Sequence, residues 1–273
     1  MPRRVRLDVE LVRRGLARSR EHAGLMIAAG RVTVAGTVAM KAATAVGTDA
    51  AVVIRGDASQ PDYVSRGGHK LAGALDALAA EGLAVMGRRC LDAGASTGGF
   101  TDVLLRRGAA SVVAVDVGYG QLAWSLRQEQ KVVVLERTNV RDLTSTQAGG
   151  PVDLVVGDLS FVSLRTVLPA LTALCRPDGD LLLLVKPQFE VGRERLGRGV
   201  VRDPRLRAAA VVDVSASAAR LGWGTRAVTA SPLPGPAGNV EYFVWLRRGG
   251  TSLDPQRARA EVDAGPTGER VTT

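Results

Sequence analysis

Charged residues directly follow apolar runs in the second half of the chain, and these are the residues whose types could do chemistry. The run 152–157 leads into Asp158, and the run 181–185 leads into Lys186. Strand ends of a parallel sheet meet at one edge, where α/β proteins bind their ligands. An acid and a lysine brought together there can move a proton or stabilise a developing negative charge. We therefore predict a catalytic site at this edge.

A glycine-rich loop follows another apolar run and indicates a cofactor site. The segment 92–99, DAGASTGG, lacks the G-x-G-x-x-G spacing of dinucleotide-binding proteins. The next apolar run ends in Asp116, at about the 20-residue distance that returns a carboxylate to a ribose diol. Together they indicate an adenosine-type nucleoside without a diphosphate, so we expect S-adenosylmethionine. The candidate cofactor-binding residues are Gly94, Ser96, Thr97, Gly98, Gly99, Asp116, Asn139 and Asp158.

Strands and helices are expected to alternate from residue 90 onward, which predicts an α/β fold with a doubly wound, Rossmann-like sheet. An antiparallel edge strand at its end would resemble the class I methyltransferase sheet. The last two strands lack a long helix between them, which favours a hairpin with an antiparallel edge strand. The expected strands are 90–92, 112–116, 132–136, 152–157, 181–185, 226–229 and 241–246, and the helices are 100–107, 121–128, 163–175 and 204–221.

The segments outside this sheet suggest further domain boundaries. Residues 1–59 are expected to form a small α+β module with a helix capped by Asp8 and a second helix capped by Ser19. A polar connector with a proline, 60–64, precedes the methyltransferase domain at 65–248. The tail 249–273 is polar and is expected to be disordered.

The composition favours a polyanionic partner. Lys and Arg number 36 against 27 Asp and Glu, a net charge of +9, so nucleic acid and a membrane surface are the two candidates. No apolar run reaches the roughly 18 residues of a membrane span, and no signal peptide is visible, so we expect a cytoplasmic protein. Cys90 and Cys175 are expected as buried thiols, and the separated His22 and His69 indicate no metal site.

The N-terminal pattern resembles the S4 RNA-binding module. The resemblance lies in 6–23, RLDVELVRRGLARSREHA, in 30–36, GRVTVAG, and in Lys41. It implies that basic side chains around the two helices contact the phosphates of structured RNA. The candidates are Arg6, Arg18, Arg20 and Lys41, with Arg66 as a fifth at the start of the following domain.

Nearly the whole chain, except the tail, resembles the TlyA family, in which an S4 module precedes an FtsJ-like ribose methyltransferase domain. The matching motifs are DAGASTGGFT at 92–101, VDVGYGQL at 115–122, DLSF at 158–161, KPQFE at 186–190 and GNVEY at 238–242. The resemblance implies 2′-O-methylation of cytidine in ribosomal RNA, within one or both ribosomal subunits. It also implies a catalytic tetrad, here Lys70, Asp158, Lys186 and Glu241.

Several alternatives stay open from sequence alone. Lys186 could be the general base or could stabilise the alkoxide electrostatically. An RNA-binding ribosome factor with an idle methyltransferase fold is a second interpretation of the chain. A membrane-active protein is a third, because some members of the family are labelled haemolysins. The nucleotide modified and the oligomeric state are not encoded in any motif.

Overall fold

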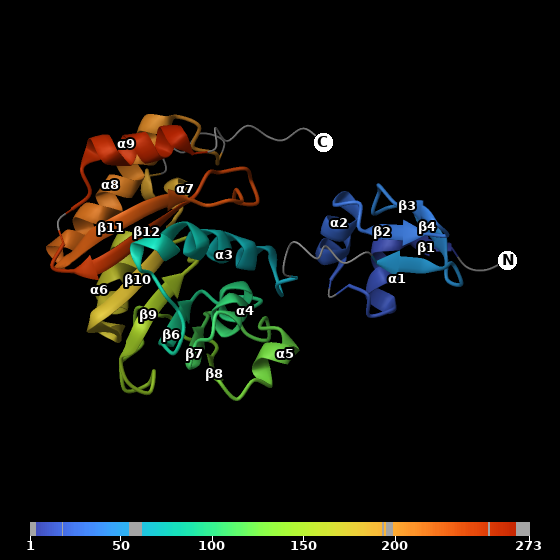
Figure 1. Ribbon diagram of the computed structural model, residues 1–273, viewed down its shortest axis with the longest axis horizontal. Helices are drawn as coiled ribbons and strands as arrows, with labels where there is room; N and C mark the ends of the chain where they lie inside the picture. Colours follow the sequence, from blue (N-terminus) through green and yellow to red (C-terminus); the bar gives the residue numbers. More distant parts are fainter. Residues whose placement is uncertain are drawn as a thin grey trace. The chain divides into compact units, whose positions relative to one another are not determined.

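The computed structural model describes residues 4–17, 19–54, 62–192, 194, 199–250 and 252–265. The chain divides into two compact units, Met1–Val64 and Ser65–Thr273. The ribbon of each unit is drawn in Figure 1.

The first unit is a small α+β module. It contains β1 (Arg4–Arg6), α1 (Leu7–Arg13), α2 (Arg20–Ala28), β2 (Val32–Val34), β3 (Thr37–Val38), β4 (Ala45–Gly47) and β5 (Val52–Ile54). A three-stranded sheet has the order β3-β2-β5, and β1 pairs with β4 antiparallel. Leu7, Leu11 and Ile27 lie at its core with at most 1% exposure, so apolar burial holds the two helices on the sheets.

The two expected helix caps have different outcomes. Ser19 caps α2, because its side chain accepts a hydrogen bond from the His22 N–H. The expectation for Asp8 is wrong: α1 begins at Leu7, with Arg6 at the N-cap position and no side-chain cap. Asp8 lies within α1 and is 4% exposed, and its carboxylate accepts from two arginines and from the Val9 N–H of its own first turn.

The second unit contains a seven-stranded sheet of order β11-β12-β10-β9-β6-β7-β8. Its elements are α3 (Arg66–Leu78), the 3-10 helix η1 (Ala79–Glu81), β6 (Arg89–Ala93), α4 (Gly99–Arg106), β7 (Ser111–Val115), α5 (Trp124–Arg127), β8 (Val132–Leu135), β9 (Val152–Gly157), α6 (Leu164–Leu174), β10 (Cys175–Val185), α7 (Pro187–Glu190), α8 (Pro204–Arg220), β11 (Trp223–Ala230), β12 (Tyr242–Arg248) and α9 (Pro255–Ala264).

The predicted fold class is confirmed, with one difference in detail. Strands β10, β9, β6, β7 and β8 are parallel, and β12 runs antiparallel to both β10 and β11. The reversed strand is therefore β12, one position inside the edge, and β11 forms the edge. This placement sets the start of β12 beside the end of β10.

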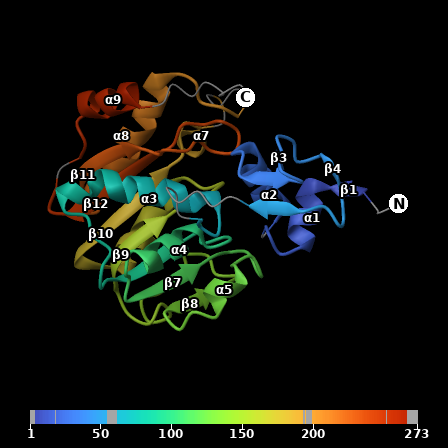
Figure 2. The ribbon, with the colours of Figure 1, turned by 45° about the vertical axis from the view of Figure 1, so that its right-hand side comes forward.

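Helices cover both faces of the sheet, as the doubly wound prediction requires. Leu91, Val113 and Leu183 belong to one buried cluster with residues of α6, α8 and α9. Asp92, which follows Leu91 in β6, points to the opposite face of the sheet. There its carboxylate accepts a hydrogen bond from Thr101 of α4. Helix α3 packs on α4, and both layers can be followed in Figures 1 and 2.

The predicted disordered tail needs a correction. Residues Pro255–Ala264 form α9, which is capped by Asp254 and packs against α8 and β11. Ala258 and Val262, one helical turn apart, are at most 3% exposed, and this short apolar stripe is enough to dock the helix. Residues 251 and 266–273 of the tail, like 55–61 around the expected connector, lie outside the described residues.

The two cysteines are free and buried, as expected. Burial raises the pKa of the Cys90 thiol and of the Cys175 thiol to about 12 each. Both are therefore neutral thiols at physiological pH, which suits a packing role.

Candidate active site

The carboxyl end of β10 and the start of β12 bring two predicted residues together. Val185, the last residue of β10, pairs with Tyr242, the first residue of β12. In an antiparallel pair the next residues outward, Lys186 and Glu241, then face each other. On the other side of β10, the parallel strand β9 ends at Gly157, directly before Asp158.

Two ion pairs occupy this edge. The Nζ of Lys186 lies 2.6 Å from Oδ1 of Asp158, and the Nζ of Lys70 lies 2.6 Å from Oε2 of Glu241. Lys70 is the fifth residue of α3 and lies just beyond its first turn. The Lys70 and Glu241 side chains are 6% and 1% exposed, whereas Asp158 is 23% exposed. The Lys186–Asp158 pair is thus the more open of the two.

Each pair has a further polar neighbour of its own. Gln188 donates from Nε2 to Oε1 of Glu241 at 3.5 Å, and Lys186 donates to the Ser160 hydroxyl at 2.7 Å. A Cβ on Gly67, three residues before Lys70, would lie 3.9 Å from Oδ2 of Asp158. The cluster can hold a proton on a lysine while acids orient both lysines. Ser160 and Gln188 were not predicted as site residues, although both follow strand ends and that signal would have found them.

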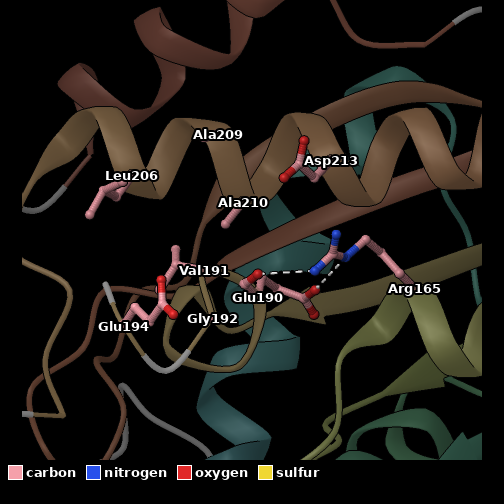
Figure 3. A pocket seen from close by; sticks show the side chains of 9 residues that line it. All are labelled: Arg165, Glu190, Val191, Gly192, Glu194, Leu206, Ala209, Ala210 and Asp213. Atoms are coloured by element: carbon pink, nitrogen blue, oxygen red, sulfur yellow. Dashed lines mark hydrogen bonds and ion pairs between the residues drawn. The ribbon is translucent and has the colours of Figure 1, made fainter. Parts of the chain in front are cut away.

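Glu190 fixes the segment that follows Lys186. It is 5% exposed and accepts hydrogen bonds from the Ser163 hydroxyl and from the Leu164 N–H, which ties α7 to the start of α6. Its ion pair with Arg165 borders a hollow of about 550 Å³ between α6, α7 and α8 (Figure 3). None of the predicted site residues lines this hollow. Glu190 was not predicted as a site residue.

The glycine-rich loop lies beside the ion pairs and is closely packed beneath. Gly94 has φ +83°, and a Cβ there would lie 2.9 Å from the carbonyl oxygen of Asp158. Gly98 has φ +97°, and its Cβ would meet Leu126 of α5 at 2.2 Å. A Cβ on Gly99 would lie 2.8 Å from the Gly68 N–H nitrogen at the start of α3. Glycine is therefore required at all three positions, because the loop packs closely on its neighbours in the protein.

Asp116 supports this loop from the next strand. Its Oδ2 accepts the Ser96 N–H at 2.7 Å and its Oδ1 accepts the Gly118 N–H at 2.7 Å. Ser96, with φ +48°, is exposed, as is Thr97. Asn139 is exposed near the end of β8 and its Oδ1 accepts the Arg141 N–H. The loop, Asp116 and Asn139 follow adjacent parallel strands, β6, β7 and β8.

Asp92 lies under the loop and was not predicted as a site residue. Its side chain is fully buried, and Thr101 donates to Oδ2 at 2.7 Å. Its Oδ1 has no hydrogen-bond partner within the described part of the chain. The pKa of Asp92 is raised to about 7, mainly by burial and also by the like charges of Asp158 and Asp116, while hydrogen bonds from Thr101 oppose the rise. The unpaired Oδ1 of this buried acid and the glycine-rich loop above it fit a cationic nucleoside cofactor.

Aromatic side chains stand beside the more open ion pair. Phe161 is 91% exposed, has φ +63°, and lies with its ring centroid 5.3 Å from that of Phe189. The Nζ of Lys186 lies 6.0 Å from the Phe189 ring centroid. Exposure of this size, with strained backbone, is typical of a ring that contacts a ligand.

The basic residues expected to contact RNA are mostly exposed. Arg6, Arg20 and Lys41 are exposed on the first unit, and Arg18 lies outside the described residues. Arg66 is the first residue of α3, and its Nη2 donates to the Pro234 carbonyl at 2.6 Å. Arg66 therefore also fastens the loop that leads to Glu241.

Two searches of the described residues bear on other functions. No set of three or more His, Cys, Asp or Glu side chains among them is arranged to hold a metal ion. No helix among them is long and apolar enough to cross a membrane.

Comparison with known proteins matches both units. A family model for FtsJ-like methyltransferases matches residues 63–248, and a model for the S4 domain matches residues 5–52. The chain is 62% identical over 248 residues to a Mycobacterium tuberculosis protein named 16S/23S rRNA (cytidine-2'-O)-methyltransferase TlyA, covering 90% of this chain and 91% of that one.

Two further relatives are similar over most of their length. YqxC of Bacillus subtilis, described as a candidate rRNA methyltransferase, is 42% identical over 94% of this chain and 90% of its own. A solved structure of a candidate hemolysin from Streptococcus thermophilus matches with a TM-score of 0.74 at 36% identity, covering 96% of this chain and 95% of that one. The expected S4 and FtsJ-like segments are therefore both confirmed.

Proposed function

Because the chain belongs to the TlyA family of FtsJ-like methyltransferases with an S4 domain, we propose that it methylates the ribose 2′-hydroxyl of cytidine in ribosomal RNA. S-adenosylmethionine is the proposed methyl donor. We assign RNA binding to residues 1–59 and catalysis to residues 65–248. The substrate lies within ribosomal subunits, which places the enzyme in the cytoplasm.

The observation that carries this proposal is the cluster of two lysines and two acids beside the glycine loop. Lys70, Asp158, Lys186 and Glu241 come from four separate segments and form two ion pairs of 2.6 Å. Burying four charged groups costs free energy that a structural role alone does not require. Their position at the carboxyl edge of the sheet is where this fold binds its ligands.

The residues of the cluster suit activation of a sugar hydroxyl. A ribose 2′-hydroxyl is a weak nucleophile until its proton is taken or its developing charge is stabilised. Lys186 Nζ is the proposed group for either task, because it belongs to the more open pair. Asp158 and Ser160 hold Lys186 in place, and Glu241 does the same for the more buried Lys70. The buried Oε1 of Gln188 has no partner among described residues and can accept a hydrogen bond from the sugar.

The proposed cofactor site consists of Gly94, Ser96, Thr97, Gly98, Gly99, Asp116, Asn139 and Asp158, with Asp92 added by the structure. When bound, S-adenosylmethionine supplies the activated methyl group. The glycines let its body approach the backbone, and Asp116 is the group proposed to meet the ribose diol. Phe161 is proposed to stack on a base near the reacting ribose. Arg6, Arg18, Arg20, Lys41 and Arg66 are the proposed phosphate contacts.

The test is methyl transfer to isolated ribosomal subunits. Purified full-length protein is incubated with labelled S-adenosylmethionine and with each subunit separately, and the modified linkage is mapped as resistance to alkaline hydrolysis. We expect label at a cytidine ribose of at least one subunit. Binding to subunits without incorporation would instead indicate an RNA-binding factor with an idle methyltransferase fold. Label in a base rather than a ribose would replace the proposed reaction.

A further inference from the structure

One carboxylate of the first unit holds two arginines. Asp8 accepts from Arg6 through Nε at 2.9 Å and Nη2 at 3.0 Å, and from Arg20 through Nε at 3.1 Å and Nη2 at 3.0 Å. Arg6 ends β1, and Arg20 opens α2. The buried Asp8 therefore fixes two guanidinium groups from separate segments side by side.

The two guanidinium groups keep a free side. The Arg6 and Arg20 side chains are 50% and 61% exposed, against 5% for Asp8. Each uses Nε and Nη2 for Asp8, and Nη1 of each has no partner within the described residues. The three groups together carry a net charge of +1, which matches the single negative charge of one phosphodiester. Guanidinium N–H groups suit phosphate oxygens in geometry as well as in charge.

A second acid on the same helix provides an internal contrast. Glu10 of α1 pairs with Arg13 and Arg14 at 2.5 and 2.6 Å and is fully buried. Arg14 is only 21% exposed and also donates to the carbonyls of Thr48 and Ala50. Its guanidinium is used within the fold and fastens α1 to residues 48–50. Glu10 therefore holds one exposed arginine, Arg13 at 56% exposure, where Asp8 holds two.

We propose that Arg6, Asp8 and Arg20 form a phosphate clamp, in which the buried carboxylate holds two arginines ready for one phosphodiester of structured RNA. Asp8 is a positioning residue and does not itself touch the phosphate. The clamp lowers the cost of ordering two long side chains on binding, because they are ordered beforehand. The inference rests on the proposed function only for the identity of the polyanion.

The clamp is tested by whether the substitution Asp8→Asn weakens or strengthens RNA binding. Asp8→Asn and Glu10→Gln each raise the net charge by one on the same helix, so bulk electrostatics alone predicts tighter RNA binding for both. The clamp requires Asp8→Asn to bind isolated ribosomal subunits about tenfold more weakly, since two arginines lose their anchor. Glu10→Gln is the matched control and should bind as tightly as the unmodified protein or more tightly. Dissociation constants are measured by filter binding over a range of salt concentrations.

A double-mutant cycle covers the case in which Asp8→Asn fails to fold, which circular dichroism would reveal. Arg6→Ala and Arg20→Ala should each lower the salt slope by about one. Two arginines that share one phosphate lose affinity together, so the double variant should lose less than the two single losses combined. Losses of affinity that are independent in Arg6→Ala and Arg20→Ala would contradict the clamp. So would an Asp8→Asn variant that folds and binds RNA as tightly as Glu10→Gln.

The same measurements separate this inference from the proposed function. If the unmodified protein binds subunits but transfers no methyl group, the proposed reaction fails and the opposite signs of Asp8→Asn and Glu10→Gln still decide the clamp. If Asp8→Asn and Glu10→Gln bind alike while the unmodified protein methylates, the clamp fails and the reaction stands.

Discussion

Asp8 in the first unit and Asp92 in the second are both buried acids, and their surroundings shift their pKa values in opposite directions. Hydrogen bonds from Arg6, opposed by burial and reinforced by Arg20, lower the pKa of Asp8 to about 2. Burial raises the pKa of Asp92 to about 7, with only the Thr101 hydroxyl as a side-chain donor and with Asp158 and Asp116 adding like charge. Burial raises the pKa of a carboxyl group and nearby donors and cations can outweigh it, so the balance of the two decides whether a buried acid is charged.

The proposed catalytic cluster resembles Asp8 in that each of its acids lies beside a cation. Asp158 and Glu241 each have a lysine at 2.6 Å, so each acid at the site has a cation of its own. Asp92 has none among the described residues, although it is the second-last residue of β6, which reaches the same edge. The region thus contains two acids that each hold a lysine and, beneath the loop, a buried acid that has no cation among the described residues. The following predictions remove the lysine beside Asp158, the charge of Asp92, the hydrogen-bond donor to Asp92 and, with acid, the charge of Asp8.

Removing the cation from Asp158 should have the largest effect. Lys186→Ala leaves Asp158 without a lysine, as Asp92 is now, and takes away the proposed activating group. We expect the single-turnover rate of methyl transfer to fall by about a thousandfold or more. Binding of S-adenosylmethionine, measured by calorimetry, should change little. Lys131→Ala removes a lysine of the same charge from an exposed position and is the control. Persistent transfer in Lys186→Ala would exclude Lys186 from the reaction.

Removing the charge of Asp92 should change how stability depends on pH. Between about pH 4 and pH 7, Asp92 is protonated in the folded protein and ionised in the unfolded chain. The free energy of unfolding therefore falls as pH rises through this window. Asp92→Asn removes this pH dependence. Between about pH 4 and pH 7, the free energy of unfolding of Asp92→Asn relative to that of the unmodified protein should increase by about 1.4 kcal/mol per pH unit. Urea unfolding at a series of pH values measures it. Parallel profiles of the two proteins would contradict the burial argument.

Removing the donor from Asp92 should have a smaller effect. Thr101→Val keeps the shape and deletes the hydrogen bond of 2.7 Å. The bond is expected to contribute about 1 kcal/mol with neutral Asp92 and about 2 kcal/mol with the carboxylate. The cost of Thr101→Val should therefore rise with pH through about 7, the value to which burial raises the pKa of Asp92. In an Asp92→Asn background the cost should lose this pH dependence.

The sequence reveals the edge of the sheet well and its individual contacts less well. Asp158 and Lys186 were found because a charge directly after a buried apolar run is a local signal. Lys70 and Glu241 were assigned only through the family resemblance, because α3 and the start of β12 are far apart in the chain and share no pattern. Asp92 was missed as a site residue because it falls within an apolar strand, and nothing local shows that one of its oxygens lacks a partner.

Short elements and distant ion pairs were the hardest to predict. Asp8 was taken for an N-cap because an acid near a helix start usually has that role. Its contact with Arg20 depends on how α1 and α2 pack, which no spacing rule gives. Strands β1 and β4 have three residues each, too few to show alternation. Helix α9 was missed because a two-residue apolar stripe within a polar tail is a weak signal.

Removing the charge of Asp8 with acid should have the smallest effect and the opposite sign to that of Asp92. Arg6 and Arg20 lower the pKa of Asp8 to about 2, so the stability they contribute is present above about pH 4 and is lost as pH falls toward 2. Solvent screens both half-exposed arginines, which keeps this contribution modest. Thermal unfolding of the unmodified protein should therefore shift to lower temperature below about pH 4, and Asp8→Asn should lack that part of the shift. Equal acid shifts in both proteins would mean that the arginines do not hold the carboxylate. Because Asp8 stays ionised throughout the physiological pH range, the affinity of the clamp for phosphate should not change with pH within that range.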